Sequence, residues 1–528
     1  MKNLIALTLL STTFTGFAFA DEDADPAEIA IGERLFLETR FAQSWYVNPG
    51  KADPALKETL TTGKSLRGAF AGGTMNCRAC HMVDEHQEEA GMRTYADFAR
   101  LSPIPDRGDG KKKTGRNSMS LVNINKDDVD NILFHFDGEF NSLEELVIGT
   151  LTGRNYGWRA DEKAMAIKHI AKTVRSDDGK GELAQEFGGS YRKILGGTAK
   201  VIPAELRLPA EYRINVDTAS ELDVAKAVAR LIAAYTGDLG FAVDEQGNYE
   251  GSPYDAFLKS NKLPMSADKN ETATAYGQRL VAAVNKISSP RFIQNDKKYF
   301  ETHKQAFRFG DKELRGMKLF FSKGSATQSG GNCASCHQAP HFTDFRFHNT
   351  GITQNTYDAV HGQNSFNMLA IPGLKKRNQD PERYLPATSQ HPDARAPFRS
   401  PVSKDKPGYT DLGLWNIAVN PAVPGPQKKI KAIMCGTDSA CSNDSLLQNS
   451  IATFKTPTVR DTGHSAPYMH TGALNTLKDV VTRYIQNSVL VRQGKLRNGD
   501  DELEGIYLSS ADADDLVAFL NALNEDYD

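Results

Sequence analysis

The sequence is short of cysteine and tryptophan and has no excess of charge of either sign. Its 528 residues include six cysteines and three tryptophans, and 63 Lys and Arg face 66 Asp and Glu, a net charge of −3. Six cysteines are too few to form a disulfide scaffold for the whole chain, whose length corresponds to three to four domains of about 150 residues each. The charge balance argues against a nucleic-acid partner, because binding to phosphates needs a clustered excess of cations.

Long apolar runs are also missing beyond the first twenty residues. The mean hydropathy is −0.48, and 24% of the residues are charged, as in soluble globular proteins. Residues 1–20 place Lys2 before an apolar run that ends in Ala18-Phe19-Ala20. This run is too short and too interrupted to span a membrane, and its pattern predicts a cleaved secretory signal. We therefore expect an exported protein without a membrane span after cleavage, in a compartment that permits disulfides.

The cysteines fall into three pairs, and two of these pairs belong to the same motif. C-x-x-C-H, the attachment site of c-type haem, occurs as Cys77, Cys80 and His81 and again as Cys333, Cys336 and His337. Two thiols at this spacing can form thioethers with both vinyl groups of one haem, and the adjacent imidazole can bind its iron. A single copy would also suit a redox dithiol or half of a zinc site. Two copies, far apart and each followed by His, favour two covalently bound haem c groups.

The third pair, Cys435 and Cys441, has no adjacent His and predicts a disulfide that staples a loop. It lies in an irregular segment of about residues 356–450 that is rich in Pro, Gly, Asn and Asp. Loops of this length are usually functional or disordered. We expect an ordered insertion, because the disulfide and side chains such as Leu414 and Trp415 give it something to pack.

The two haem motifs belong to a duplicated unit. Residues 136–147 align with 470–481, and both stretches read as a glycine turn, a Ser or Thr N-cap and an apolar helix face. Between the repeats, helical periodicity dominates, as in 221–232 and 273–284. The sequence therefore predicts a mainly α protein with two tandem cytochrome c-like haem domains. Their expected extents are 21–275, with a helical linker, and 276–528, with the insertion.

Several motifs resemble those of the bacterial dihaem cytochrome c peroxidases and their MauG-type relatives. They are the two C-x-x-C-H sites, residues 318–352 and 454–484, and more weakly residues 136–151. The resemblance implies a periplasmic protein in which peroxide reacts at the N-terminal haem. Electrons would then enter through the C-terminal haem.

The resemblance also implies the iron ligands. His81 and His337 would be the proximal ligands. Where the peroxidase branch has a Met, eight residues after the position of Thr476, this chain has Tyr484, as in the MauG branch. A tyrosinate favours ferric iron; the alternative is that Met469 or another group binds instead. In the stretch that commonly holds a distal His, the only histidine is His86. It lies five residues after His81, too close to reach the other side of the haem, so we expect an open N-terminal iron.

Other positions depart from the family pattern. The family usually has a Glu that moves protons near the peroxide, and Tyr156 stands in its place. Nearby candidates that could take over this role are Arg154, Arg159 and Glu162. Both branches have a Trp between the haems, and Phe136, which is hard to oxidise, stands at this position in the chain. These residues are the expected catalytic set, with Tyr156, Arg154 and Phe136 foremost.

One structural site follows from the resemblance. The family holds a calcium ion between the haems with an Asn side chain and two backbone carbonyls, and the matching residues are Asn117, Ser465 and Pro467. Oxygen ligands suit Ca²⁺. The alternative is that Asn117 only caps a turn.

These observations predict a peroxidase that reduces hydrogen peroxide at the His81 haem. Its electrons would come from a small redox protein, a cytochrome c or a cupredoxin. Two alternatives stay open: MauG-like peroxide-dependent oxidation of a partner protein, and a non-enzymatic dihaem electron carrier. The resemblance also suggests a homodimer.

Overall fold

The computed structural model is rich in helix, and its described residues contain two small antiparallel sheets. It describes residues 25–47, 49, 76–81, 104, 107–109, 111, 113–125, 131–198, 200–300, 305–463 and 465–525. The predicted signal segment 1–20 and His86 lie outside these residues. In one sheet β1 (Ile293–Tyr299) pairs with β2 (Ala306–Phe309), and in the other β3 (Phe347–His348) pairs with β4 (Phe454–Lys455).

The helices follow one another along the whole described chain. They are α1 (Ala27–Phe36), α2 (Gln43–Val47), α4 (Cys77–Cys80), α5 (Leu143–Leu151), α6 (Lys163–Ser176), α7 (Glu182–Glu186), α8 (Tyr191–Gly196), α9 (Glu221–Asp238), α10 (Pro253–Ser260), α11 (Ala273–Asn285), α12 (Asp311–Phe321), α13 (Ile352–His361), α14 (Ser365–Met368), α15 (Leu374–Gln379), α16 (Pro381–Tyr384), α17 (Gln427–Cys435), α18 (Asn443–Asn449), α19 (Leu477–Arg492) and α20 (Ser510–Asn521). The helices expected around 221–232 and 273–284 are therefore confirmed, as α9 and α11.

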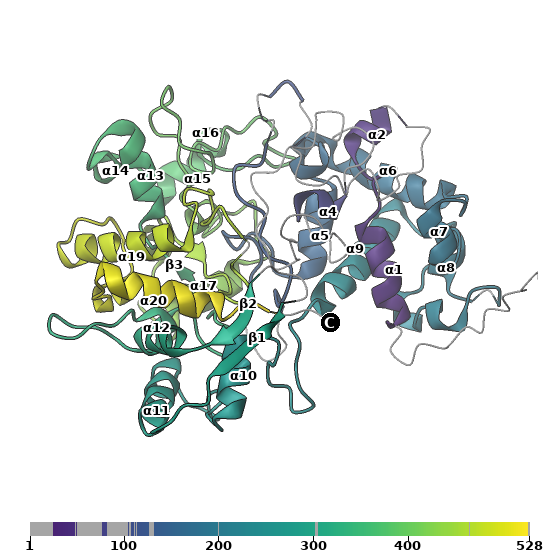
Figure 1. Ribbon diagram of the computed structural model, residues 1–528. Helices are drawn as coiled ribbons and strands as arrows, with labels where there is room; N and C mark the ends of the chain where they lie inside the picture. The colour runs from purple at the N-terminus through teal and green to yellow at the C-terminus, as the bar shows by residue number, and fades with distance from the viewer. Residues whose placement is uncertain are drawn as a thin grey trace, which may run out of the picture.

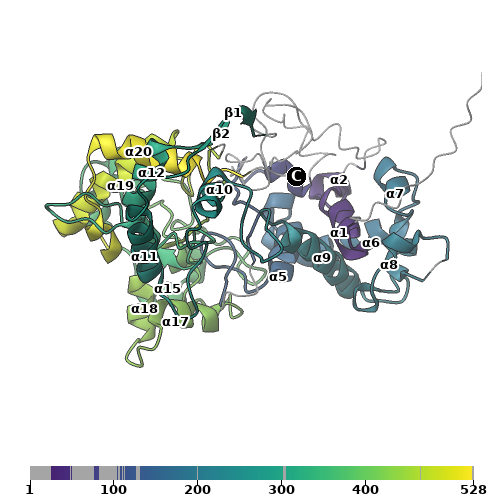
Figure 2. The same cartoon turned by 60° about the horizontal axis from the view of Figure 1, so that its bottom comes forward.

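Two large hydrophobic cores form around equivalent helix pairs. In the first core α1 packs against α9, which also contacts α5 and α6; in the second, α12 packs against α20, which also contacts α19. The two groups of helices lie on opposite sides of the molecule in Figure 1 and again in Figure 2. The second core takes up α10, beginning with Tyr254. The second core thus includes part of the stretch 21–275, which was expected to end in a helical linker.

A glycine allows the close approach in each helix pair. A Cβ on Gly32 of α1 would lie 2.3 Å from the carbonyl oxygen of Leu231 in α9. A Cβ on Gly316 of α12 would lie 2.0 Å from the carbonyl oxygen of Asp515 in α20. Neither helix pair could pack at this distance with any other residue in place of the glycine.

The aligned stretches fold alike. Each has an isolated antiparallel bridge around a glycine with positive φ: Phe134 with Phe140 around Gly138 (68°), and Tyr468 with Leu474 around Gly472 (66°). A hydroxyl then caps the next helix, because Ser142 accepts from the amide of Glu145 in α5 and Thr476 accepts from the amide of Asp479 in α19. The local signals read from the sequence thus produce the same turn and helix start twice.

The segment 356–450 is ordered and contains helices α14 to α18. It builds two small cores, one around Trp415 and Leu447 and the other around Leu414 and Ile430. A disulfide joins Cys435 to Cys441, the predicted pair, with an S–S distance of 2.03 Å. Its helices are short and were not expected from a composition rich in Pro, Gly and Asn.

The part of the chain that the structure describes includes no helix with both the length and the apolar character needed to cross a membrane.

Candidate functional site

The first C-x-x-C-H motif forms the short helix α4 and ends on a fixed imidazole. Nδ1–H of His81 donates to the carbonyl of Met119 at 2.9 Å. Because that bond occupies Nδ1, Nε2 is the nitrogen left for a metal. Burial lowers the pKa of His81 to about 4, so the imidazole is neutral at neutral pH, as an iron ligand must be.

The second motif repeats this arrangement on a 3₁₀ turn, Cys333–Ser335. Nδ1–H of His337 donates to the carbonyl of Phe342 at 3.2 Å, and burial lowers the pKa of this imidazole too. None of the four motif cysteines is in a disulfide. Two thiols and a neutral imidazole with a committed Nδ1, present twice, form a donor set that fits covalently attached haem.

Tyr484 lies in α19 and faces the second motif. Burial raises the pKa of its phenol, and the nearby Cys336 and Cys333 thiols and Asp500 carboxylate raise it further. A phenol in such surroundings ionises only beside a strong cation, which ferric iron would provide. Met469, the alternative ligand, is partly buried against a small cluster that includes Ile352.

The predicted catalytic residues do not gather into one proton-transfer site. The Tyr156 hydroxyl lies 3.2 Å from Sγ of Cys77, beside the haem anchor. Arg154 makes two hydrogen bonds to Asp109, at 2.8 and 2.9 Å, near the surface.

The other two candidates for proton transfer are held in ion pairs as well. Glu162 receives two hydrogen bonds from Arg107 at 2.8 and 2.6 Å. Arg159 reaches Asp393 of the insertion at 3.3 Å. Each of the charged residues that the sequence suggested is thus held by a partner of opposite charge.

Phe136 lies where the two halves meet. Its ring is 6.4 Å from that of His470, which stacks on Phe454 at 3.7 Å between centroids. The amide of Lys455 donates to the carbonyl of Phe136 at 2.8 Å, and burial lowers the pKa of the Lys455 amine to about 7. Lys455 was missed from the sequence because a single lysine in a strand gives no sign that it is buried.

Asn117 meets the backbone of the second half at two points. Its Nδ2 donates to the carbonyls of Pro467, at 2.8 Å, and Met469, at 3.0 Å, while its buried Oδ1 has no hydrogen-bond partner. Of the predicted calcium set, Asn117 and Pro467 are therefore in contact, and Met469 supplies the second carbonyl on the Asn117 amide. Ser465, the third predicted member, is fully buried and lies two residues before Pro467 in the chain.

A buried ion-pair network ties the insertion to the first half. Asp137, fully buried, pairs with Arg116 at 2.8 Å and with Arg399 of the insertion at 2.9 Å. Arg116 also binds Asp411 of the insertion, and Arg399 binds Glu139 at 2.5 Å. Sequence reasoning did not find this network because the partners lie far apart along the chain. It holds the insertion against the segment that leads into α5.

His348 is clamped beside the second haem motif. Nε2 lies 2.8 Å from Asp344 and Nδ1 lies 2.5 Å from Asp500. Burial opposes a charge on this imidazole, but the hydrogen bonds to Asp344 and Asp500 outweigh it and raise its pKa far above the usual value. The imidazolium is therefore the resident form.

This shift predicts a pH dependence of stability. A raised pKa stabilises the folded state fully below the unfolded value of about 6.5, and this contribution declines as the pH rises further, by up to about 1.4 kcal/mol per pH unit. We expect the free energy of unfolding of the holoprotein to fall more steeply between pH 6.5 and 9 than that of His348→Asn, measured by urea titration. Equal slopes would contradict the clamp.

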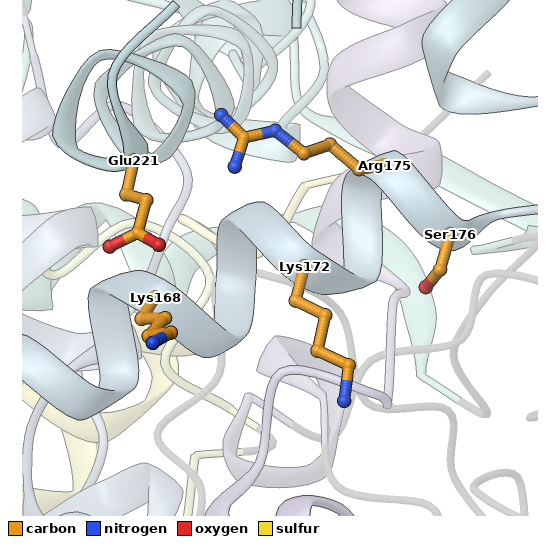
Figure 3. A pocket seen from close by; sticks show the side chains of 5 residues that line it. All are labelled: Lys168, Lys172, Arg175, Ser176 and Glu221. Carbon is orange, nitrogen blue, oxygen red and sulfur yellow. The ribbon is translucent and has the colours of Figure 1, made fainter. Parts of the chain in front are cut away.

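A surface hollow is lined by other residues. Lys168, Lys172, Arg175, Ser176 and Glu221 line it, from α6 and the start of α9, as Figure 3 shows. Arg175 is already bonded to the carbonyls of Val216 and Ala219. The hollow contains none of the predicted site residues.

Comparisons with known proteins agree with the haem motifs. No family model matches the chain. It is 22% identical over 274 residues to the cytochrome-c peroxidase IdrP1 of Pseudomonas sp. strain SCT, covering 51% of this chain and 53% of that protein. It is 27% identical over 213 residues to the cytochrome-c peroxidase IdrP2 of Denitromonas iodatirespirans, covering 40% and 38%. The chain thus spans about half or less of the length of these relatives.

Two solved structures are similar at low TM-scores. The diheme peroxidase BthA from Burkholderia thailandensis has a TM-score of 0.44 at 17% identity, over 95% of this chain and 87% of that one. A MauG-like protein associated with microbial copper homeostasis has a TM-score of 0.44 at 16% identity, over 96% and 91%. The curated sequence relatives confirm the kinship that the motifs predicted, and the chain is related to the cytochrome c peroxidases.

Proposed function

We propose that this chain is an exported dihaem c-type peroxidase that reduces hydrogen peroxide at a haem held by Cys77, Cys80 and His81. Electrons reach that haem through a second one, held by Cys333, Cys336 and His337, from a small redox protein such as a cytochrome c or a cupredoxin. The observation that carries the proposal is the pair of neutral imidazoles, each with Nδ1 bonded to a carbonyl and each following a pair of cysteines. Relatives named cytochrome-c peroxidases support it.

In this function the chain's residues hold and tune the cofactors. Haem iron supplies the redox chemistry that reduces the O–O bond. The bonds from His81 to Met119 and from His337 to Phe342 fix the tautomer and orientation of each ligand. Tyr484 would supply an anionic oxygen to the iron of the second haem, which would favour the ferric state. Each peroxide takes up two electrons and two protons and leaves as two waters.

The test is peroxide turnover by the purified holoprotein with reduced cytochrome c or a reduced cupredoxin as donor. We expect turnover in the wild type, and its loss in His81→Ala. His391→Ala is the matched control, because the His391 side chain is 34% exposed and its imidazole pairs with Glu382 in the insertion. Failure with several donors would contradict a peroxidase.

Tyr484 favours a second candidate function, the peroxide-dependent oxidation of a partner protein as in the MauG branch. The same phenol that favours ferric iron makes the second haem a poor high-potential electron acceptor. Peroxide consumption without a small donor, accompanied by oxidation of an added protein, would favour this function over the first.

We also propose that Asn117 helps to hold a calcium ion with the carbonyls of the 465–469 segment. The unpartnered Oδ1 of Asn117 supports this proposal. If the side-chain amide turned by 180°, Oδ1 would take the place of Nδ2 and point toward the carbonyls of Pro467 and Met469, so that three oxygens could surround one ion. We expect chelation by EGTA to lower the melting temperature, since an ion at 100 times its Kd contributes about 2.7 kcal/mol.

The control for this prediction is a second buried asparagine. Asn349 also donates through Nδ2 to two carbonyls, those of Arg497 and Asn498, but its Oδ1 already accepts from the amide of Gly351. Asn117→Ala should abolish the response to EGTA and Asn349→Ala should keep it. A wild type that does not respond would show that Asn117 only joins two segments.

A further inference from the structure

A hydrogen-bonded tyrosine and histidine lie at the junction of the two halves. The Tyr249 hydroxyl is 2.7 Å from Nδ1 of His341, and Nδ2 of Asn123 donates to the same hydroxyl at 3.1 Å. Tyr249 is 5% exposed and belongs to the first core, on the connection between α9 and α10. Asn123 donates to the phenol oxygen, and when His341 carries its proton on Nε2 the phenol O–H donates to Nδ1.

Both partners lie close in sequence to the haem ligands. Asn123 is four residues after Met119, whose carbonyl holds His81. His341 immediately precedes Phe342, whose carbonyl holds His337. Tyr249 thus bridges the segment that fixes one proximal imidazole to the loop that fixes the other.

A cation lies over the Tyr249 ring and affects how this ring can be oxidised. The Arg460 guanidinium lies 4.2 Å from the ring centroid and is fixed by two hydrogen bonds to Asp255. A positive charge left on the ring would be repelled by this cation. Oxidation therefore requires the phenol proton to leave with the electron, and His341 accepts it at a distance suited to proton transfer.

We propose that Tyr249 is a redox-active relay between the two haem sites, with His341 as its proton acceptor. In the step, one electron leaves Tyr249 for a haem that hydrogen peroxide has oxidised, the Oη–H bond breaks, and the proton moves to Nδ1 of His341. A neutral phenoxyl radical and an imidazolium result. An electron from the donor and the returning proton restore the pair. The relay fits a chain that has Phe136, which is hard to oxidise, between its halves, and it rests on the proposed peroxide chemistry.

The experiment is EPR of the holoprotein frozen after oxidation by two routes. One route is hydrogen peroxide, and the other is photogenerated ruthenium(III) tris-bipyridine, which needs no reaction of peroxide. We expect a tyrosyl signal in the wild type that narrows with ring-deuterated tyrosine. The signal should be lost in Tyr249→Phe and strongly reduced in His341→Gln, whose amide accepts a hydrogen bond but not a proton.

Tyr468→Phe is the matched control, because that buried phenol donates to the carbonyl of Thr462 rather than to a base. It should keep the full signal. A signal that appears with ruthenium and not with peroxide supports the relay and counts against the peroxidase. A wild type without a tyrosyl signal on either route, or a signal that persists both in Tyr249→Phe and in His341→Gln, would overturn the relay. If Tyr249→Phe does not fold, the His341→Gln result decides.

Discussion

Tyr484→Met is expected to raise the reduction potential of the C-terminal haem by a large part of the range of about 0.8 V that axial ligands span. The anionic phenolate stabilises ferric iron, whereas the neutral thioether of Met favours the ferrous state. The position allows the exchange, because Tyr484 lies on α19 facing Cys336 and Cys333. Spectroelectrochemical titration of the holoprotein, which resolves the two haems, is the measurement.

The matched control is Tyr507→Met, in the same half of the chain. The Tyr507 ring lies 4.1 Å from the Arg492 guanidinium and is not assigned to iron. Its replacement should leave both potentials in place, and the potential of the N-terminal haem should stay unchanged in both variants. If the reduction potential of the C-terminal haem is the same in Tyr484→Met as in the wild type, Tyr484 is not an iron ligand.

Local features of this fold could be predicted from the sequence because they depend on neighbours in the chain. The aligned stretches gave the glycine turns at Gly138 and Gly472 and the caps at Ser142 and Thr476, and the structure contains all four. A capping hydroxyl satisfies an amide three residues ahead, so its effect is visible in a short window. The helix-rich character follows from the same kind of signal.

The insertion shows where composition misleads. Its abundance of Pro, Gly and Asn predicted an irregular excursion, yet it contains α14 to α18. These helices are short, four to nine residues, and isolated helices of this length are not stable in water. They persist because tertiary contacts such as those of the fully buried Trp415 hold them, and such contacts have no local signature.

The candidate site divides in the same way. The haem anchors are contiguous, so their spacing alone identifies them. Tyr249 and His341 are 92 residues apart and Arg460 and Asp255 are 205 residues apart, so only the fold brings them together. Resemblance to a family could not find these pairs either, because it directed attention to Tyr156 and Arg154, the positions that replace or adjoin a known catalytic residue.

Arg460→Met is expected to cost about 3–5 kcal/mol of unfolding free energy, because it leaves the buried Asp255 carboxylate without its cation. Burial raises the pKa of Glu525, the second partner, to about 8, so that group can hold a proton instead. Arg460 is 1% exposed and binds Asp255 at 2.8 and 2.9 Å, as well as Glu525, and both carboxylates are also buried. Its Nε–H donates to the carbonyl of Pro340 at 3.0 Å, in the loop of the second haem motif. The variant should therefore unfold at lower urea concentration and release this loop.

Arg315→Met is the matched control for that loss. Arg315 also makes two hydrogen bonds to one carboxylate, Asp515, at 2.8 and 3.0 Å, and it too joins distant parts of the chain, α12 and α20. The difference is exposure, since the Arg315 side chain is 59% exposed and that of Arg460 is 1% exposed. Water replaces the lost partner at Arg315 and cannot do so at Arg460, so urea unfolding of the holoprotein should show a small change in the first variant and a large one in the second. Equal losses would mean that Asp255 and Glu525 find another partner or a proton when the arginine is removed.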